Sequence, residues 1–305
     1  MTSVAVIIPC YNEEASVARV IDVFRSTMPQ ARIVVIDNAS TDRTAAIAKA
    51  QGAEVITEPR KGKGNAVRRA FADVDADAYV MADGDGTYDA TAAPAMVDLL
   101  FAQGLDMVIG VRDHAGQQGA YRRGHVLGNQ LLSRTFERLF DFPMTDTLSG
   151  YRVMSRRFVK SFVFGRSGFE IEAELNVHAA VLGANYAEVT TTYGRRDEDS
   201  PSKLRTYRDG VRILRRQLRL FRDLKPARAF ALLAVPWLIA AIALITPPVV
   251  GYFETGLVAR FPSLIAGVGC LLVAVQVTIA GLILDRVALA RLDAIRLRYL
   301  SLPAR

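Results

Sequence analysis

The sequence predicts an α/β domain with a mostly parallel sheet, followed by a C-terminal transmembrane hairpin of two helices. Short apolar segments alternate with amphipathic helical segments through most of the chain, a pattern typical of parallel sheets covered by helices. Two long runs without charge, residues 230–250 and 261–284, follow this region. Each run is long enough to cross the roughly 30 Å core of a bilayer as a helix.

The elements of the domain are expected in regular succession. Residues 4–9 form an apolar strand ended by a proline, and a helix with apolar residues at helical spacing follows from Asn12 to about Met28. Further strands are expected at 32–37, 55–56, 78–82, 107–110 and 185–193, and further helices at 43–51, 65–73, 91–103, 124–140 and 170–183. Ligands of such sheets bind beyond the carboxyl ends of the strands. The residues that follow the strands are therefore the candidates for a functional site.

The last third of the chain predicts attachment to a membrane. A basic helix at 204–221 carries apolar residues on one face, and this pattern is typical of helices on a membrane surface. The alternative interpretation of the same spacing is a helix that packs against the domain through its apolar stripe. Basic flanks on both sides of the apolar runs place both ends of the hairpin in the cytoplasm by the positive-inside rule. We expect four parts: an α/β domain at 1–203, a juxtamembrane helix at 204–228, two spans at 229–285 and a cytoplasmic tail at 286–305.

Charge and cysteine content exclude several classes of protein. The net charge of +7 is concentrated beside the apolar runs, which favours anionic lipid and phosphate-bearing substrates. The aromatic interleaving of single-strand binders is absent, so no nucleic-acid partner is expected. Cys10 and Cys270 form no disulfide framework, and the histidines and cysteines do not cluster as zinc ligands.

Two carboxylates follow the strand at 78–82. Asp83 and Asp85 are two residues apart, so in extended geometry their side chains point the same way. Gly84 and Gly86 allow a sharp turn and a close approach of the backbone to a ligand. Oxygen ligands on one side suit Mg²⁺ or Mn²⁺ with substrate phosphates. An acidic surface turn is the alternative.

Three other segments have a structural and a functional interpretation. Asp37 ends a strand, where it either caps the next turn or accepts hydrogen bonds from a base or ribose. Lys61 and Lys63 alternate with glycines before a helix and either bind phosphate or form a flexible surface loop. Residues 146–152 form either a polar turn or a sugar-binding or catalytic loop. The acidic residues around Glu172 begin a helix, where a structural role is the default.

Together these segments resemble family 2 glycosyltransferases, which have the Rossmann-like GT-A fold. The opening Pro9–Glu13, Asp37, Lys61–Asn65 and the Asp83-Gly84-Asp85 motif carry this resemblance. Residues 110–112, 146–152 and 202–204 with the terminal hairpin are similar to the branch of dolichyl-phosphate mannose synthase and the bacterial polyprenyl-phosphate glycosyltransferases. The sequence has no Gln-x-x-Arg-Trp motif, which argues against a processive polysaccharide synthase.

The resemblance implies a metal-dependent transferase in the cell membrane, the inner membrane if the source is bacterial. Such an enzyme moves a sugar, with inversion, from a nucleotide diphosphate sugar to polyprenyl phosphate. UDP-sugars are favoured over GDP-mannose as the donor, while Thr87 and the Asp37-Asn38-Ala39 sequence depart from the mannose synthases and leave the sugar open. A non-prenyl acceptor, or a catalytically idle scaffold, is the alternative. A homo-oligomer is also compatible with the sequence.

The resemblance also assigns roles to individual residues. The matched positions are Pro9, Tyr11, Glu13, Asp37, Lys61, Lys63, Asp83 and Gly84 for the nucleotide sugar, Asp83 and Asp85 for Mg²⁺ or Mn²⁺, Arg112, Arg123, Ser202 and Lys203 for the acceptor phosphate, and Asp85, Asp146, Arg112 and Arg123 for catalysis. Asp146 is the candidate general base if the reaction uses one, and it otherwise binds sugar hydroxyls.

Overall fold

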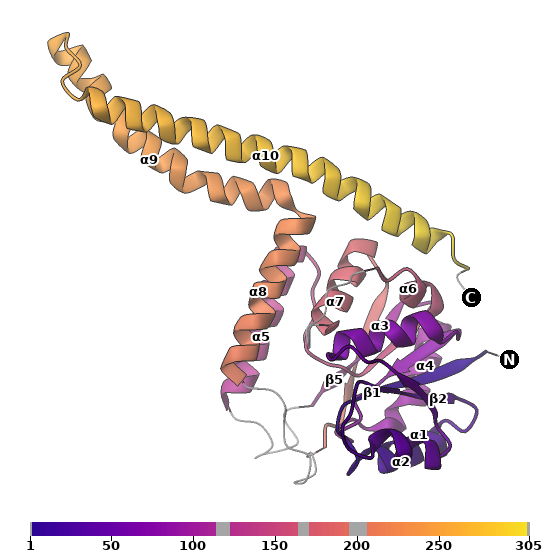
Figure 1. Cartoon of the computed structure of the whole chain (residues 1–305). Coiled ribbons are helices and arrows are strands. Elements are labelled where there is room, and N and C mark those ends of the chain that lie inside the picture. Colours follow the sequence, from indigo (N-terminus) through magenta and orange to yellow (C-terminus); the bar gives the residue numbers. More distant parts are fainter. Residues whose placement is uncertain (1, 114–122, 164–170, 195–205, 304–305) are drawn as a thin grey trace. The chain divides into compact units, whose positions relative to one another are not determined.

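The computed structural model describes residues 2–113, 123–163, 171–194 and 206–303 (Figure 1). The chain divides into two compact units. The first is Met1–Gln217 together with Ile295–Arg305, and the second is Leu218–Ala294. The expected α/β domain lies in the first unit, and most of the long apolar helices lie in the second.

A seven-stranded sheet forms the centre of the first unit. Its strands are β1 (Val4–Cys10), β2 (Arg32–Asp37), β3 (Glu54–Thr57), β4 (Ala78–Met81), β5 (Met107–Arg112), β6 (Arg152–Ser155) and β7 (Tyr186–Thr191), in the order β3-β2-β1-β4-β6-β5-β7. Pairing is parallel except for β6, which runs antiparallel between β4 and β5. The expectation of a mostly parallel sheet is therefore confirmed.

Helices cover both faces of the sheet (Figure 1). They are α1 (Val17–Thr27), α2 (Thr44–Ala50), α3 (Lys63–Asp73), the 3-10 turn η1 (Ala90–Ala92), α4 (Ala93–Ala102), α5 (Arg123–Phe140), α6 (Arg156–Lys160) and α7 (Ile171–Leu182). Alternation along β1 explains the two layers: Val6 and Ile8 join the core cluster that includes residues of α1 and α4, while Ile7 is fully buried on the other face.

The prediction from the sequence was wrong about the start of one helix and missed two elements. The helix expected from Asn12 begins at Val17, because the intervening backbone bonds to the next loop: Asn12 N donates to Ser40 Oγ at 3.0 Å and Glu13 N to Thr44 Oγ1 at 2.8 Å. Strand β6 and helix α6 were not expected. Their short lengths give the periodicity of the sequence little room to reveal them.

The strand order reverses direction beside β1. The chain runs from β1 outward through β2 and β3, and then returns to the other side of β1 as β4. In α/β sheets, ligands bind at such a reversal, beyond the carboxyl ends of the strands. Cys10 is in register with Asp37, and Ala82 N donates to Ile7 O at 3.2 Å. Asp37 and the Asp83 loop therefore flank the end of the same central strand.

The second unit is a pair of long apolar helices, α9 (Pro226–Thr255) and α10 (Phe261–Leu300, whose last residues belong to the first unit). Both are long and apolar enough to cross a membrane, and only 17% of the most apolar stretch of each is buried. Buried helices of a soluble core would hide much more of this surface. The predicted pair of helices is thus present, with α10 continuing as a helix beyond the expected span.

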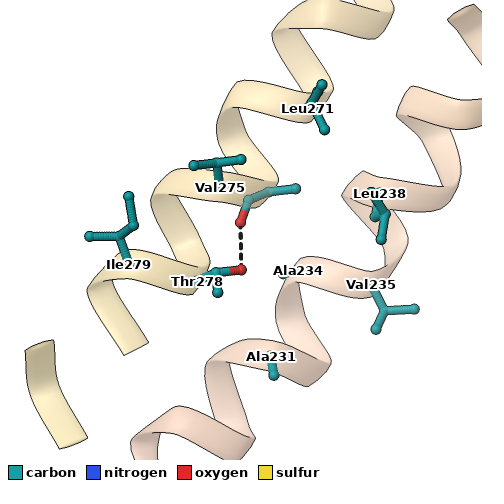
Figure 2. A pocket seen from close by; sticks show the side chains of 9 residues that line it. Ala231, Ala234, Val235, Leu238, Leu271, Val275, Thr278 and Ile279 are labelled. Carbon is teal, nitrogen blue, oxygen red and sulfur yellow. Dashed lines mark hydrogen bonds between the residues drawn. The ribbon is translucent and has the colours of Figure 1, made fainter. Parts of the chain in front are cut away.

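The two helices pack closely through small residues. A Cβ atom added to Gly281 would lie 2.6 Å from Phe230, and one added to Gly267 would lie 2.6 Å from Ile245. Close approach through small residues is typical of membrane helix pairs. Figure 2 shows the apolar hollow between them, which is lined by Ala231, Ala234, Val235, Leu238, Leu271, Ala274, Val275, Thr278 and Ile279.

The basic helix α8 (Thr206–Leu224) contacts the α/β unit at its first part. Gln217 Nε2 donates to Leu132 O of α5 at 3.4 Å, and Arg216 pairs with the buried Glu174 of α7. This part of the helix therefore contacts the domain through polar side chains, while Val211 and Leu218 of the expected apolar stripe are 49% and 47% exposed. Arg215 and Arg219 are exposed. The prediction of a membrane-surface helix therefore applies to these two side chains and not to Arg216.

The end of α10 also belongs to the α/β unit. The Tyr299 hydroxyl donates to both oxygens of Asp106, at 2.8 and 2.9 Å, and its ring lies 4.7 Å from the Arg157 guanidinium. Arg298 donates to Lys160 O at 2.9 Å. The segment expected as a tail is therefore helical to Leu300 and is attached to the domain.

Candidate active site

Asp37 presents a buried carboxylate at the end of β2. The residue is 6% exposed, and its Oδ1 atom has no hydrogen-bond partner among the described residues. A buried acceptor without a donor is costly unless a ligand supplies the donor. The turn after β2 is closed by other side chains, since Asn12 Oδ1 accepts from Thr41 N at 2.8 Å and Asp42 Oδ1 from Thr44 N at 3.0 Å. Capping by Asp37 is therefore not needed here.

Asn38 attaches the glycine-lysine loop to the end of β2. Its amide nitrogen donates to Arg60 O at 2.7 Å, and its oxygen accepts from Gly62 N at 2.7 Å. Lys61 lies over the Tyr11 ring, with Nζ 5.4 Å from the ring centre and 3.4 Å from the hydroxyl. The loop therefore has a defined conformation, which brings two predicted nucleotide-sugar residues together.

Lys63 is held between two carboxylates at the start of α3. Its Nζ lies 2.5 Å from Asp83 Oδ1 and 2.6 Å from Glu172 Oε1. Burial lowers the pKa of Lys63, but the negative charges of Asp83 and Glu172 raise it by more, so the pKa lies well above its ordinary value. Burial raises the pKa of Asp83, and the carboxylates of Asp85 and Glu172 add to this against the opposing charge of Lys63. A cation at this position relieves the repulsion between the carboxylates.

The Asp83–Asp85 turn is fixed by its neighbours. Asp85 is 2% exposed, and its Oδ1 accepts from Thr87 N at 3.1 Å and Thr87 Oγ1 at 2.7 Å. Thr87 thus orients Asp85. A Cβ atom added to Gly84 would lie 2.5 Å from Cys10 Sγ, so the turn needs glycine to sit against the end of β1.

The donor set of this turn suits a divalent ion with oxygen ligands. Asp83 and Asp85 supply carboxylate oxygens only, and Mg²⁺ and Mn²⁺ accept such ligands. Among the residues that the structure describes, no cluster of three or more metal-binding side chains occurs. Two carboxylates fit an ion that takes its remaining ligands from water and substrate phosphates.

Arg112 and Asp146 form a second, separate ion pair. Arg112 Nε donates to Asp146 Oδ2 at 2.8 Å and Nη2 to Oδ1 at 2.7 Å, and the two side chains are 12% and 2% exposed. The guanidinium also lies 5.6 Å from the centre of the Tyr193 ring. Both oxygens of Asp146 are thus engaged by one arginine, which fixes the direction of the guanidinium.

Tyr88 and Gly150 fill the space around Lys63 and Asp83. The Tyr88 hydroxyl accepts from Gly150 N at 2.9 Å, and the ring stacks on Tyr151 with centres 5.2 Å apart. A Cβ atom added to Gly150 would lie 3.0 Å from Lys63 Nζ and 3.2 Å from Asp83 Oδ2. The predicted loop at 146–152 is therefore close to the acidic turn.

The structure describes only some of the other predicted site residues. Pro9 is buried in β1 beside Ile36, and Glu13 is 7% exposed with its Oε2 3.4 Å from Ser16 Oγ. Arg123 begins α5, but its side chain is outside the description, as are Ser202 and Lys203 altogether. Their proposed roles remain predictions.

Sequence reasoning missed Glu172 as a contact of the site. The carboxylate was given a structural role at a helix start, yet it binds Lys63 across 109 positions of sequence. Nothing in the local pattern distinguishes a helix-start acid that faces solvent from one that faces an active-site lysine. The pairing of α7 with α3 supplies this information.

Comparison with known proteins gives the family. Residues 5–162 match the sequence model described as Glycosyl transferase family 2. Glycosyltransferase AglJ of Haloferax volcanii is 38% identical over 224 residues, covering 73% of this chain and 72% of that protein. The dolichyl-phosphate hexose transferase of the same organism is 32% identical over 210 residues, covering 68% of this chain and 90% of that protein.

A solved structure is similar in fold. Glucosyl-3-phosphoglycerate synthase from Mycobacterium tuberculosis, crystallised with Mn²⁺, UDP-glucose and phosphoglyceric acid, superposes with a TM-score of 0.55 at 23% identity. The similarity covers 72% of this chain and 80% of that one, which supports the GT-A-like fold. By fold, by motif and by the extent of the match, the chain belongs to glycosyl transferase family 2.

Proposed function

We propose that this protein transfers a sugar from a nucleotide diphosphate donor to the phosphate of a polyprenol at a membrane surface. Membership of the family supports sugar transfer, and the dolichyl-phosphate hexose transferase among the relatives supports a prenyl phosphate acceptor. The two exposed apolar helices support a location where such an acceptor is available. The product would be a monosaccharide linked to the lipid through one phosphate.

The observation that carries the donor assignment is the buried Oδ1 of Asp37, which lacks a donor among the described residues. A base N–H or a ribose hydroxyl would satisfy it. The diphosphate would then extend along the end of β1 toward Lys61 and Lys63, with Tyr11, Glu13 and Pro9 forming the near wall. A UDP-sugar remains the favoured donor, with GDP-mannose as the alternative.

Asp83 and Asp85 would hold Mg²⁺ or Mn²⁺ together with the diphosphate. The metal-bound neighbour structures, in which Mn²⁺ accompanies UDP-glucose, support a divalent ion of this kind. When bound, such an ion neutralises charge on the leaving nucleoside diphosphate. Thr87 would keep Asp85 directed toward the diphosphate, and Gly84 would allow the turn to lie close to it.

Arg112 would bind the acceptor phosphate, together with Arg123, Ser202 and Lys203. A guanidinium suits this role because its planar fork matches phosphate oxygens. Asp146 accepts from Nε and Nη2 of Arg112, and it would thereby direct the opposite edge of the guanidinium toward the phosphate. A phosphate oxygen would attack the anomeric carbon as the bond to the diphosphate breaks, which inverts the configuration. A phosphate monoester is already anionic near neutral pH, so this attack needs no strong general base.

The hairpin would hold this site at the cytoplasmic face of the membrane. The basic segments on either side of α9 and α10 support this orientation under the positive-inside rule. Arg215 and Arg219 on the exposed side of α8 would contact anionic headgroups.

The test is release of nucleoside diphosphate by the purified full-length protein in liposomes, with a panel of nucleotide sugars. We expect one donor to give rapid release only when polyprenyl phosphate is present, EDTA to stop it, and Asp85→Asn to reduce it by orders of magnitude. Glucosyl-3-phosphoglycerate synthase suggests a soluble phosphorylated acceptor as the second candidate. Release driven by soluble acceptors, with none from polyprenyl phosphate, would select that candidate. No release from any donor would indicate an idle scaffold.

A further inference from the structure

Lys63 has two carboxylate partners, and the proposed metal site needs one of them. Its Nζ atom lies 2.5 Å from Asp83 Oδ1 and 2.6 Å from Glu172 Oε1. The three side chains are largely shielded, with 19%, 28% and 11% of the surface of Lys63, Asp83 and Glu172 exposed. Solvent therefore screens their charges only in part.

A divalent ion on Asp83 competes with this ammonium group. Lys63 occupies Oδ1 of the same carboxylate, and two cations that share one carboxylate repel each other strongly in a shielded site. Repulsion between the two cations therefore favours displacement of Lys63 from Asp83 by the ion. Without a second partner, the displaced ammonium would be a largely buried charge left unpaired, which is strongly unfavourable.

The surroundings restrict where the displaced lysine can go. The backbone of Gly150 closes one side, since a Cβ atom there would lie 3.0 Å from Nζ. The Tyr88 hydroxyl, which would be 3.3 Å from the same Cβ atom, accepts from Gly150 N. Glu172 on α7 is the partner that Lys63 can keep while it leaves Asp83.

We propose that Glu172 is a positioning residue that retains Lys63 while a divalent ion takes its place on Asp83. This inference rests on the proposed metal site at Asp83 and Asp85. In the metal-free protein Lys63 bridges both carboxylates, and in the loaded protein it stays on Glu172, beside the donor phosphates. Glu172 thereby sets the metal affinity through Lys63, without itself being a ligand.

The test is the dissociation constant of Mn²⁺ for the full-length protein in detergent, measured from the EPR signal of free Mn²⁺ without donor. We expect Glu172→Gln to raise the Kd about tenfold, or about 1.4 kcal/mol, because Lys63 then has Asp83 as its remaining partner. Lys63→Met should lower the Kd. In the Lys63→Met background, Glu172→Gln should change the Kd by less than about threefold, since the two positions are coupled.

Glu174→Gln is the matched control. Glu174 is a buried carboxylate on the same helix, but it pairs with Arg68 at 2.8 Å and with Arg216 instead of Lys63. Glu174→Gln should leave the Mn²⁺ Kd within about twofold of wild type, because Glu174 does not pair with Lys63. If Glu172→Gln does not fold, Glu172→Asp replaces it. The shorter side chain should raise the Kd only in protein that retains Lys63, and not in the Lys63→Met background.

The outcomes separate this inference from the proposed function. An equal effect of Glu172→Gln with and without Lys63 would overturn the inference, since Glu172 would then act as a nearby charge or a ligand. Wild-type protein that binds no Mn²⁺, or binding that survives Asp85→Asn unchanged, would instead refute the metal site.

Discussion

Asp146→Asn tests whether the ion pair with Arg112 serves the acceptor phosphate. The substitution keeps the size of the side chain and one acceptor oxygen, but it places an amide donor against the guanidinium in place of the other oxygen. The wild-type pair makes two hydrogen bonds, of 2.7 and 2.8 Å, with 2% of Asp146 exposed. Arg112 would therefore lose its fixed direction as well as a charged partner.

The magnitude follows from the lost contact. A hydrogen bond that involves a charged group contributes about 1.5–3 kcal/mol. Loss of one such bond in a site this well shielded should cost about 2–3 kcal/mol, or about 30- to 150-fold in kcat/KM. The loss should appear for polyprenyl phosphate as the varied substrate, because Arg112 is proposed to bind the acceptor. The KM for the nucleotide sugar should change little.

The assay is steady-state transfer in liposomes with each substrate varied in turn. Asp75→Asn is the control, because Asp75 pairs with Arg156 in the same two-bond geometry, at 2.9 and 2.9 Å, but is 62% exposed. An exposed pair contributes about 0–1 kcal/mol, so this variant should lose less than about fivefold. Equal losses in the two variants, or a loss confined to the donor KM, would refute the assignment of Arg112 and Asp146.

Three further predictions concern the pH dependence of stability, the turn at Asp83–Asp85 and the basic face of α8. Burial lowers the pKa of His178 to about 4, and unfolding restores a pKa near 6.5. Protonation therefore favours the unfolded state as the pH falls from 6.5 to 4, and the free energy of unfolding should decrease by about 3 kcal/mol at pH 4. Thermal melts of His178→Gln should lack this part of the pH dependence. Gly84→Ala should destabilise the protein by about 1–3 kcal/mol through overpacking against Cys10 Sγ, and Gly84→Ala/Cys10→Ala should recover most of that loss in the same melts. Charge reversal at Arg215 and Arg219 should raise the KM for polyprenyl phosphate in anionic liposomes, since each basic residue contributes about 1 kcal/mol at such a surface; the increase should shrink at high salt, and an unchanged KM at low salt would contradict the lipid contact.

Sequence patterns located the parts of the site that follow directly from strand ends. Asp37, Lys63 and the Asp83–Asp85 turn each follow a short apolar strand or precede a helix, so parallel pairing brings them to one edge of the sheet. Local chemistry was also enough to predict the two long apolar helices. These features need only short-range order and the general topology of α/β sheets.

Contacts between distant segments could not be read in the same way. Strand β6 was missed because Arg152, its first residue, is a charged side chain that is nevertheless fully buried, with Nε bonded to Ser149 O at 2.9 Å. Glu172 and Arg216 were placed by local rules as a helix-start acid and a membrane-surface base, while the structure pairs them with Lys63 and Glu174. These contacts depend on the packing of α3, α7 and α8, which the periodicity of the sequence does not reveal.

The nature of the lipid product tests the central claim most directly. Purified full-length protein in liposomes would be supplied with the donor selected above, Mg²⁺ and polyprenyl phosphate, and the lipid phase would be analysed by mass spectrometry and by NMR of the anomeric centre. We predict a polyprenyl phosphate that carries one sugar through its phosphate, with the anomeric configuration inverted relative to the donor. Sugar found only on a soluble acceptor, a second phosphate in the lipid linkage, or a retained configuration would contradict the account.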